Sequence, residues 1–142
     1  MKKRNEKFFE GKTWNVVFEQ LKFSKHYEKL CKKLKEKKIV FYGAGLMFDY
    51  FAQNYDLSKL NIAGIADKKI ETKNIETYQG IKTLSFEELK NCDFDCILIT
   101  TQYPVVIRNF LKFELFGLNK KCPPIYFLLN KPFMLYLEEI WE

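Results

Sequence analysis

The sequence predicts a three-layer α/β fold, in which a parallel sheet of about five strands carries helices on both faces. Three observations support this prediction. Short apolar runs alternate with amphipathic segments along most of the 142 residues. The apolar run at residues 38–42 leads directly into the turn Gly43-Ala44-Gly45. A second apolar run ends at Asp67, roughly 20 residues after this turn, which is the spacing of a dinucleotide-binding βαβ unit.

The chain begins with a basic segment. Residues 1–12 are polar, and from Trp14 to about Lys37 apolar residues recur at three- and four-residue steps. This spacing predicts an amphipathic helix, which either packs on the sheet or contacts another subunit. We therefore expect a basic arm and helix over residues 1–36, followed by one globular α/β unit over residues 37–142.

The remaining elements follow in alternation. The helix after the glycine turn spans residues 45–55, and the polar, aperiodic segment 67–79 is predicted to be a loop. Ser85 and Glu88 form a capping-box pattern before a short helix, and Gly117 ends a helix that starts at about Pro104. A last helix is predicted over 132–141. The predicted strands cover residues 38–42, 61–66, 80–84, 95–101 and 125–129, and right-handed crossovers give the order 3-2-1-4-5.

Charge is unevenly distributed along the chain. The formal net charge is +6, and residues 1–38 contain thirteen basic against five acidic side chains. A basic arm could contact nucleic acid or an anionic membrane surface, whereas a solvated helix face is the simpler interpretation. The sequence lacks the interleaved recognition motifs of nucleic-acid-binding modules, so we do not expect a nucleic-acid partner.

Cysteine and histidine usage gives no metal-site pattern. The chain has four cysteines and one histidine, His26, which we interpret as a surface residue. A closed zinc site needs four ligands, so no metal is expected, and the cysteines are expected to be reduced thiols. No apolar run is long enough to cross a bilayer. Charged residues interrupt the segment after Met1-Lys2-Lys3-Arg4, which argues against a signal peptide and for a cytoplasmic protein.

The expected ligand site lies beyond the carboxyl ends of the strands, where strands one and four are neighbours. Gly43 would allow the tight turn, Gly45 would let the backbone approach a pyrophosphate at the helix N-terminus, and Asp67 would accept hydrogen bonds from a ribose. Phe48 occupies the position of the third glycine, so its ring must tilt the helix outward or turn elsewhere. The candidate cofactor-binding residues are Gly43, Ala44, Gly45, Leu46, Asp67, Lys68, Thr100, Thr101 and Gln102.

Each of these residues also has a purely structural interpretation. The glycine turn could only connect strand and helix, and Asp67 could only form a turn or start a helix. Lys68 could be a solvated surface residue, and the two threonines could reflect strand propensity. Catalytic motifs are absent: the sequence has no Gly-x-Ser-x-Gly elbow and no Gly-Lys-Ser/Thr phosphate loop. Tyr103, near the expected site, is followed four residues later by Ile107 rather than by the lysine of the short-chain reductases. No catalytic residue is assigned.

Four segments together resemble a known group of proteins. They are Ile39-Val40-Phe41-Tyr42-Gly43-Ala44-Gly45, then residues 62–67, 80–85 and 95–100. They are similar to the Rossmann-type domain of bacterial nucleotide-sugar dehydratases and epimerases of the polysaccharide biosynthesis family. Stand-alone nucleotide-sugar 4-dehydrogenase-like proteins and the nucleotide-sugar-binding domain of sugar acyltransferases share this pattern. The similarity covers roughly residues 37–130 and implies that Gly43, Ala44, Gly45 and Asp67 contact a nucleotide.

The resemblance implies a small protein that binds NAD, NADP or a nucleotide-sugar in bacterial surface-glycan biosynthesis. It could act in NAD-dependent sugar-nucleotide oxidoreduction together with a partner enzyme, or as a homodimer. The alternative is a non-catalytic interaction or regulatory module with a degenerate nucleotide site. In that case the basic N-terminal helix and the aromatic C-terminal stretch would form a subunit interface.

Overall fold

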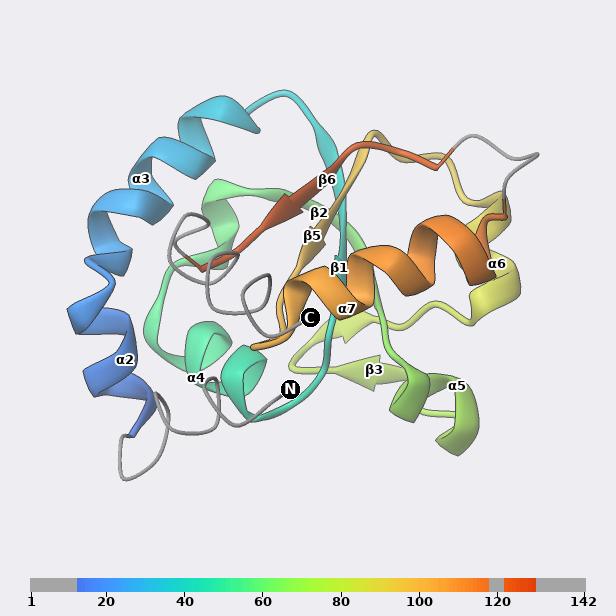
Figure 1. The fold of residues 1–142 in the computed structure, drawn as a ribbon, viewed down its shortest axis with the longest axis horizontal. Coiled ribbons are helices and arrows are strands. Elements are labelled where there is room, and N and C mark those ends of the chain that lie inside the picture. Colours follow the sequence, from blue (N-terminus) through green and yellow to red (C-terminus); the bar gives the residue numbers. More distant parts are fainter. Residues whose placement is uncertain (1–12, 118–121, 130–142) are drawn as a thin grey trace.

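The computed structural model describes residues 13–117 and 122–129, and it has an α/β fold (Figure 1). The predicted arm at residues 1–12 and the predicted helix at 132–141 lie outside the described residues. The core of the fold is a parallel four-stranded sheet in the order β2-β1-β5-β6. Its strands are β1 (Lys38–Tyr42), β2 (Asn61–Ala66), β5 (Cys96–Ile99) and β6 (Ile125–Phe127).

The order of these four strands confirms the prediction, but the predicted strand at 80–84 does not join the sheet as a full member. Ile81–Lys82 (β4) pairs antiparallel with Thr77–Tyr78 (β3) in a separate hairpin. Only Thr83 forms a single parallel bridge with Ile65 of β2. Gln79 and Gly80 both have positive φ, 50° and 78°, which matches the two-residue turn favoured in tight hairpins.

Helices cover both faces of the sheet and create two separate hydrophobic cores. Because side chains alternate along β1, Ile39 and Phe41 face one core, and Val40 and Tyr42 face the other. The first core is covered by α2 (Trp14–Gln20), α3 (Phe23–Lys33) and α4 (Leu46–Asn54). The second core is covered by α6 (Phe86–Asn91), α7 (Pro104–Asn109) and the helical segment η2 (Phe110–Leu115). This is the three-layer arrangement that the sequence predicts.

The predicted helix at residues 14–37 is two helices rather than one. Lys22 has a left-handed backbone with φ of 52°, which ends α2 and starts α3. Phe18 and Phe23, on either side of this break, are fully buried with ring centroids 4.5 Å apart. Residues of both helices share a core with Ile39 and Phe41 of β1, so the segment packs on one face of the sheet, as one of the two alternatives predicts.

The prediction of a loop at residues 67–79 is wrong, because this segment contains α5 (Lys68–Lys73) as well as β3. Asp67 caps α5 by accepting a hydrogen bond from the Lys69 N–H at 2.8 Å. Ile70 is the buried residue that anchors the helix to the core. A helix with one apolar anchor shows no hydrophobic periodicity, which is why the sequence pattern does not reveal it.

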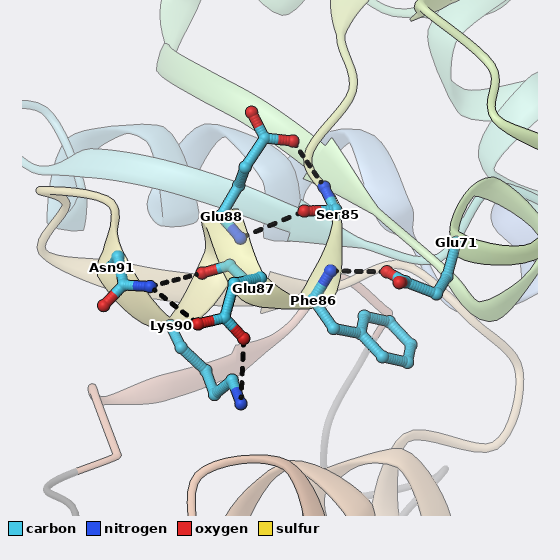
Figure 2. A network of polar contacts seen from close by, with 7 residues as sticks. All are labelled: Glu71, Ser85, Phe86, Glu87, Glu88, Lys90 and Asn91. Atoms are coloured by element: carbon cyan, nitrogen blue, oxygen red, sulfur yellow. Dashed lines mark hydrogen bonds and ion pairs between the residues drawn. The ribbon is translucent and has the colours of Figure 1, made fainter.

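The capping box predicted for α6 is present (Figure 2). The Glu88 N–H donates to Oγ of Ser85 at 3.1 Å, and the Ser85 N–H donates to the Glu88 carboxylate at 2.9 Å. Glu71 of α5 accepts a hydrogen bond from the Phe86 N–H, which joins α5 to the start of α6. These contacts fix the main chain at Phe86.

The predicted helix at 104–115 is α-helical only as far as Asn109. Phe110–Leu115 forms the π-helical segment η2, in which the Phe116 N–H bonds to the Leu111 carbonyl five residues earlier, at 2.9 Å. Single π turns inside helices are rare and frequently occur at functional sites.

Within the described ranges, no helix has the length and apolar character needed to cross a membrane.

Candidate functional site

The glycine turn is held between β1 and β5 by close contacts. Gly43 has φ of +131°, and a Cβ at this position would lie 2.6 Å from Cγ2 of Thr101 and 2.7 Å from Oγ1 of Thr100. The Gly43 N–H donates to the Ala66 carbonyl at 2.9 Å, and the buried Thr100 hydroxyl donates to the Gly43 carbonyl at 2.7 Å. Gly43 is therefore required by the backbone conformation and by the close approach of β5.

Asp67 lies next to this turn and is already bonded to the main chain. One carboxylate oxygen accepts from the Ala44 N–H at 2.6 Å, and the other accepts from the Lys69 N–H at 2.8 Å. The carboxylate thus connects the glycine turn to the start of α5. Each carboxylate oxygen can accept a second hydrogen bond, so these contacts leave acceptor capacity for a ligand hydroxyl.

A cavity of about 280 Å³ opens at the N-terminus of α4. A Cβ added at Gly45 would meet nothing within 4 Å, and Leu46 is 75% exposed. Among the described residues no side chain caps α4, so the N–H groups of its first turn have no side-chain acceptor there. The lining residues are Trp14, Gly45, Leu46, Met47, Asp67, Thr100, Thr101 and Gln102.

A second and larger cavity, of about 570 Å³, lies between the carboxyl ends of the strands and the helix pair α7–η2. Asp67 and Thr101 line both cavities, so the smaller and the larger cavity adjoin each other at these two side chains. The remaining lining residues of the larger cavity are Tyr42, Lys68, Val106, Ile107, Asn109, Phe110, Phe113 and Glu114. Phe113 is 60% exposed, which gives this cavity an apolar rim.

Aromatic rings support the wall of the larger cavity. The Phe86 ring lies 6.3 Å from that of Tyr42 and 5.8 Å from that of Phe110. The main chain at Phe86 is fixed by the hydrogen bonds around α6 (Figure 2), and its ring packs against two residues that line the cavity. Burial, with the nearby charges of Asp67 and Glu71, raises the pKa of Tyr42, so its hydroxyl remains protonated at neutral pH.

Thr101 is a polar residue of this site whose hydrogen bonding is incomplete. Its Oγ1 is buried and, among the described residues, has no hydrogen-bond partner. A buried hydroxyl without a partner destabilises a protein and is a common sign of a group that bonds to a ligand or to water. The adjacent Thr100 differs, because its hydroxyl is bonded to main-chain carbonyls.

The structure brings together all nine candidate residues around the glycine turn, but in different ways. Gly43 and Ala44 use their N–H groups within the protein, whereas Gly45, Leu46 and Gln102 line the smaller cavity. Lys68 lines only the larger cavity. Thr100 and Thr101 follow β5 directly.

The Phe48 ring turns away from the site. It is fully buried in the core under α4, with ring centroids 5.4 Å from Phe41 and 6.0 Å from Tyr78. Phe48 lines neither cavity. Of the two consequences expected for a bulky residue at this position, turning elsewhere is therefore the one observed.

Sequence reasoning missed the residues that α7 and η2 contribute. Val106, Phe110 and Phe113 are spaced by four and three residues, which places them on one helical face. The exposure of Val106 and Phe113, at 41% and 60%, shows that this face is not buried in the core. The spacing was visible in the sequence, but it is equally typical of a helix that packs on a sheet.

Metal-binding and thiol side chains are further reactive groups among the described residues. In the part of the chain that the structure describes, no three His, Cys, Asp or Glu side chains are grouped closely enough to hold a metal ion. All four cysteines are unpaired, and burial raises the pKa of Cys96 to about 11. A buried thiol with a raised pKa is a poor nucleophile at neutral pH.

Comparison with known proteins gives one match. A family model described as C2185-like, N-terminal matches residues 25–120, about two thirds of the chain, from α3 to just beyond η2. No curated protein and no solved structure matches the sequence. The matched range contains the glycine turn, Asp67, both threonines and the helix pair that lines the larger cavity. The chain belongs to the C2185-like N-terminal domain family.

Proposed function

We propose that this protein binds a nucleotide-type ligand, either NAD(P) or a nucleotide-sugar, across the carboxyl ends of β1, β2 and β5. The observation that carries the proposal is the pair of cavities that share Asp67 and Thr101. Open α/β sheets bind ligands at this edge, next to the strand at which the order reverses. The combined size of the cavities lies in the range of small-molecule sites.

The smaller cavity suits the phosphate groups. In the part of the chain that the structure describes, the N–H groups in the first turn of α4 have no side-chain cap, and the positive end of the helix dipole favours an anion there. The space beside Gly45 allows a phosphate to approach the backbone. Gln102, on the opposite wall, supplies an amide that can donate to phosphate oxygens.

The larger cavity suits the nucleoside. Tyr42, Phe110 and Phe113 provide apolar and aromatic surface for a base, and Asp67 can accept from a ribose hydroxyl. Lys68, at the rim, adds a positive charge. NAD, when bound, would supply the capacity to accept hydride from a sugar carbon, while the residues named here bind and orient it.

The test is ligand binding measured by thermal shift and calorimetry on the full chain. NAD, NADP, UDP and UDP-N-acetylglucosamine are added at millimolar concentration. A ligand at a hundredfold excess over its dissociation constant stabilises the native state by about 2.7 kcal/mol, which for a chain of this length corresponds to roughly 8 °C. Absence of any shift with all four ligands would refute the proposal.

Matched variants locate the binding. Lys68→Met removes a charge at the cavity rim, and Lys73→Met makes the same change at the other end of α5. Gln102→Ala removes a cavity amide, and Gln53→Ala changes an exposed glutamine of α4. We expect the first member of each pair to weaken binding several-fold and the second to leave it unchanged. Asp67 is avoided, because its substitution also disturbs the glycine turn.

A second function, an interaction module, is favoured by the exposed apolar side chains around the site. Leu46, Val106 and Phe113 are 75%, 41% and 60% exposed. Such side chains gathered near two cavities are typical of a protein interface. A role in surface-glycan biosynthesis, either with a partner enzyme or as a homodimer, is proposed from the sequence resemblance alone. Sedimentation of Phe113→Ser beside the unmodified chain would show whether this rim causes self-association.

A further inference from the structure

We propose that the outer edge of β6 is a docking site for an extended acidic peptide segment of another protein, which adds to the sheet as a further strand. This site is separate from the nucleotide site proposed above. It consists of a groove of about 260 Å³ beside β6, lined by α3 on one face of the sheet and by Arg108 of α7 on the other.

The edge of β6 has main-chain groups available for pairing. β6 pairs with β5 on one side, and no described strand pairs with its other side. The Pro124 carbonyl and the Leu128 N–H bond to β5. Because main-chain groups alternate in direction along a parallel strand, Ile125 and Phe127 direct theirs outward, into the groove. The His26 ring lies against the main chain of Phe127, so the groups of Ile125 are the more accessible ones. A peptide strand could bond to these groups, as in other cases of strand addition.

The charge of the groove selects an acidic partner. His26, Lys29, Lys33 and Arg108 line it, and no acidic residue does. The ion pair found among the described residues, Lys90–Glu87, lies on α6, so the cations of the groove have no carboxylate partner in this part of the chain. His26, which the sequence predicts to be a surface residue, is half-buried against the main chain of Phe127 and Leu128, and its buried Nε2 has no hydrogen-bond partner among the described residues.

The cations are held on opposite faces of β6. Nζ of Lys33 lies 4.9 Å from the ring centroid of Tyr126, on the α3 side, and the Arg108 guanidinium lies 5.9 Å from that of Phe127, on the α7 side. Side chains of an added strand alternate between the two faces. Acidic residues at consecutive positions of the peptide would therefore meet Lys33 and Arg108 in turn, which predicts a motif with two adjacent acids between β-forming residues.

The experiment measures binding of a fluorescein-labelled peptide, TVEEVT, to the full chain by fluorescence anisotropy. Lys33→Glu and Arg108→Glu are compared with Lys32→Glu on α3 and Lys112→Glu on η2, which continues α7. Both controls reverse exposed charges outside the groove. We expect each groove variant to weaken binding about fivefold or more, and each control less than twofold. Circular dichroism and melting confirm that each variant is folded.

Two further probes separate strand addition from simple charge attraction. The same peptide with N-methyl groups on every residue keeps its charges but cannot pair along either of its edges, so its binding should be lost. Inorganic phosphate at millimolar concentration should not displace the unmethylated peptide. Equal binding of the methylated peptide, full displacement by phosphate, or equal effects of groove and control variants would each overturn the proposal.

Discussion

Two glycines of the same turn are expected to respond to substitution by alanine with losses of stability of very different size. Gly43 has φ of +131°, and its added Cβ would lie 2.6 Å and 2.7 Å from side-chain atoms of Thr101 and Thr100, and 3.0 Å from the Thr100 main chain. Gly45 has φ of −111°, and its added Cβ would meet nothing within 4 Å. The two variants thus differ in backbone strain and in steric contact, while the added group is the same.

The expected magnitudes follow from these contacts. A side chain in a backbone region reserved for glycine costs about 1–3 kcal/mol, and overpacking of a tight interface adds about 1–3 kcal/mol. Gly43→Ala should therefore lower the free energy of unfolding by about 2–6 kcal/mol. Gly45 is the N-cap of α4, where alanine is less favourable than glycine, so Gly45→Ala should lose no more than about 1 kcal/mol.

Urea denaturation followed by circular dichroism measures both changes, and a loss of 3 kcal/mol corresponds to a fall in Tm of roughly 9 °C. The reasoning would be refuted by equal stability of the two variants, or by a larger loss at Gly45. Gly45→Ala also places a methyl group in the smaller cavity, so a weaker response to nucleotide with an intact fold would link this position to the ligand.

Thr100→Val should lose about 1–3 kcal/mol in urea titrations because it leaves the Gly43 carbonyl unsatisfied, and no loss would contradict the hydrogen bond at 2.7 Å. Asp67→Asn should lose a similar amount, since an amide cannot accept from both the Ala44 and Lys69 N–H groups; an unchanged midpoint would show that these bonds are dispensable. Burial lowers the pKa of His26 below 6.5, so its contribution to stability is present above pH 6.5 and is lost as the pH falls through the lowered pKa. His26→Gln should thus flatten the decline in unfolding free energy between pH 7 and pH 5, and parallel pH profiles would argue against a buried neutral ring.

The main architecture could be predicted because strong local signals and topology rules agree. The run at 38–42, the glycine turn and the run at 61–66 each have one dominant interpretation, and β2 begins and ends where the apolar pattern does. The capping box at Ser85 is a similarly local signal. In α5, by contrast, Ile70 is the one buried residue, so the spacing of apolar residues could not indicate a helix.

The details of the site depended on tertiary contacts that the sequence does not encode locally. The π-helical segment that begins at Phe110 places aromatic residues at the larger cavity, and no sequence pattern distinguishes it from an α-helix. Asp67 accepts from the Ala44 N–H, 23 residues earlier in the chain, as well as from the nearby Lys69 N–H. The break at Lys22 likewise follows from burial of the aromatic residues on both sides rather than from a glycine or proline.

The hairpin β3–β4 has a consequence for how copies of this protein meet. It lies beside β2 through the bridge at Thr83, which obstructs that edge of the sheet and leaves β6 as the open edge among the described strands. Two copies related by a two-fold axis could pair only β6 against β6. Lys33 and Arg108 of each copy would then face the same charges of the other. The groove thereby protects the open edge against self-aggregation while remaining receptive to an acidic strand.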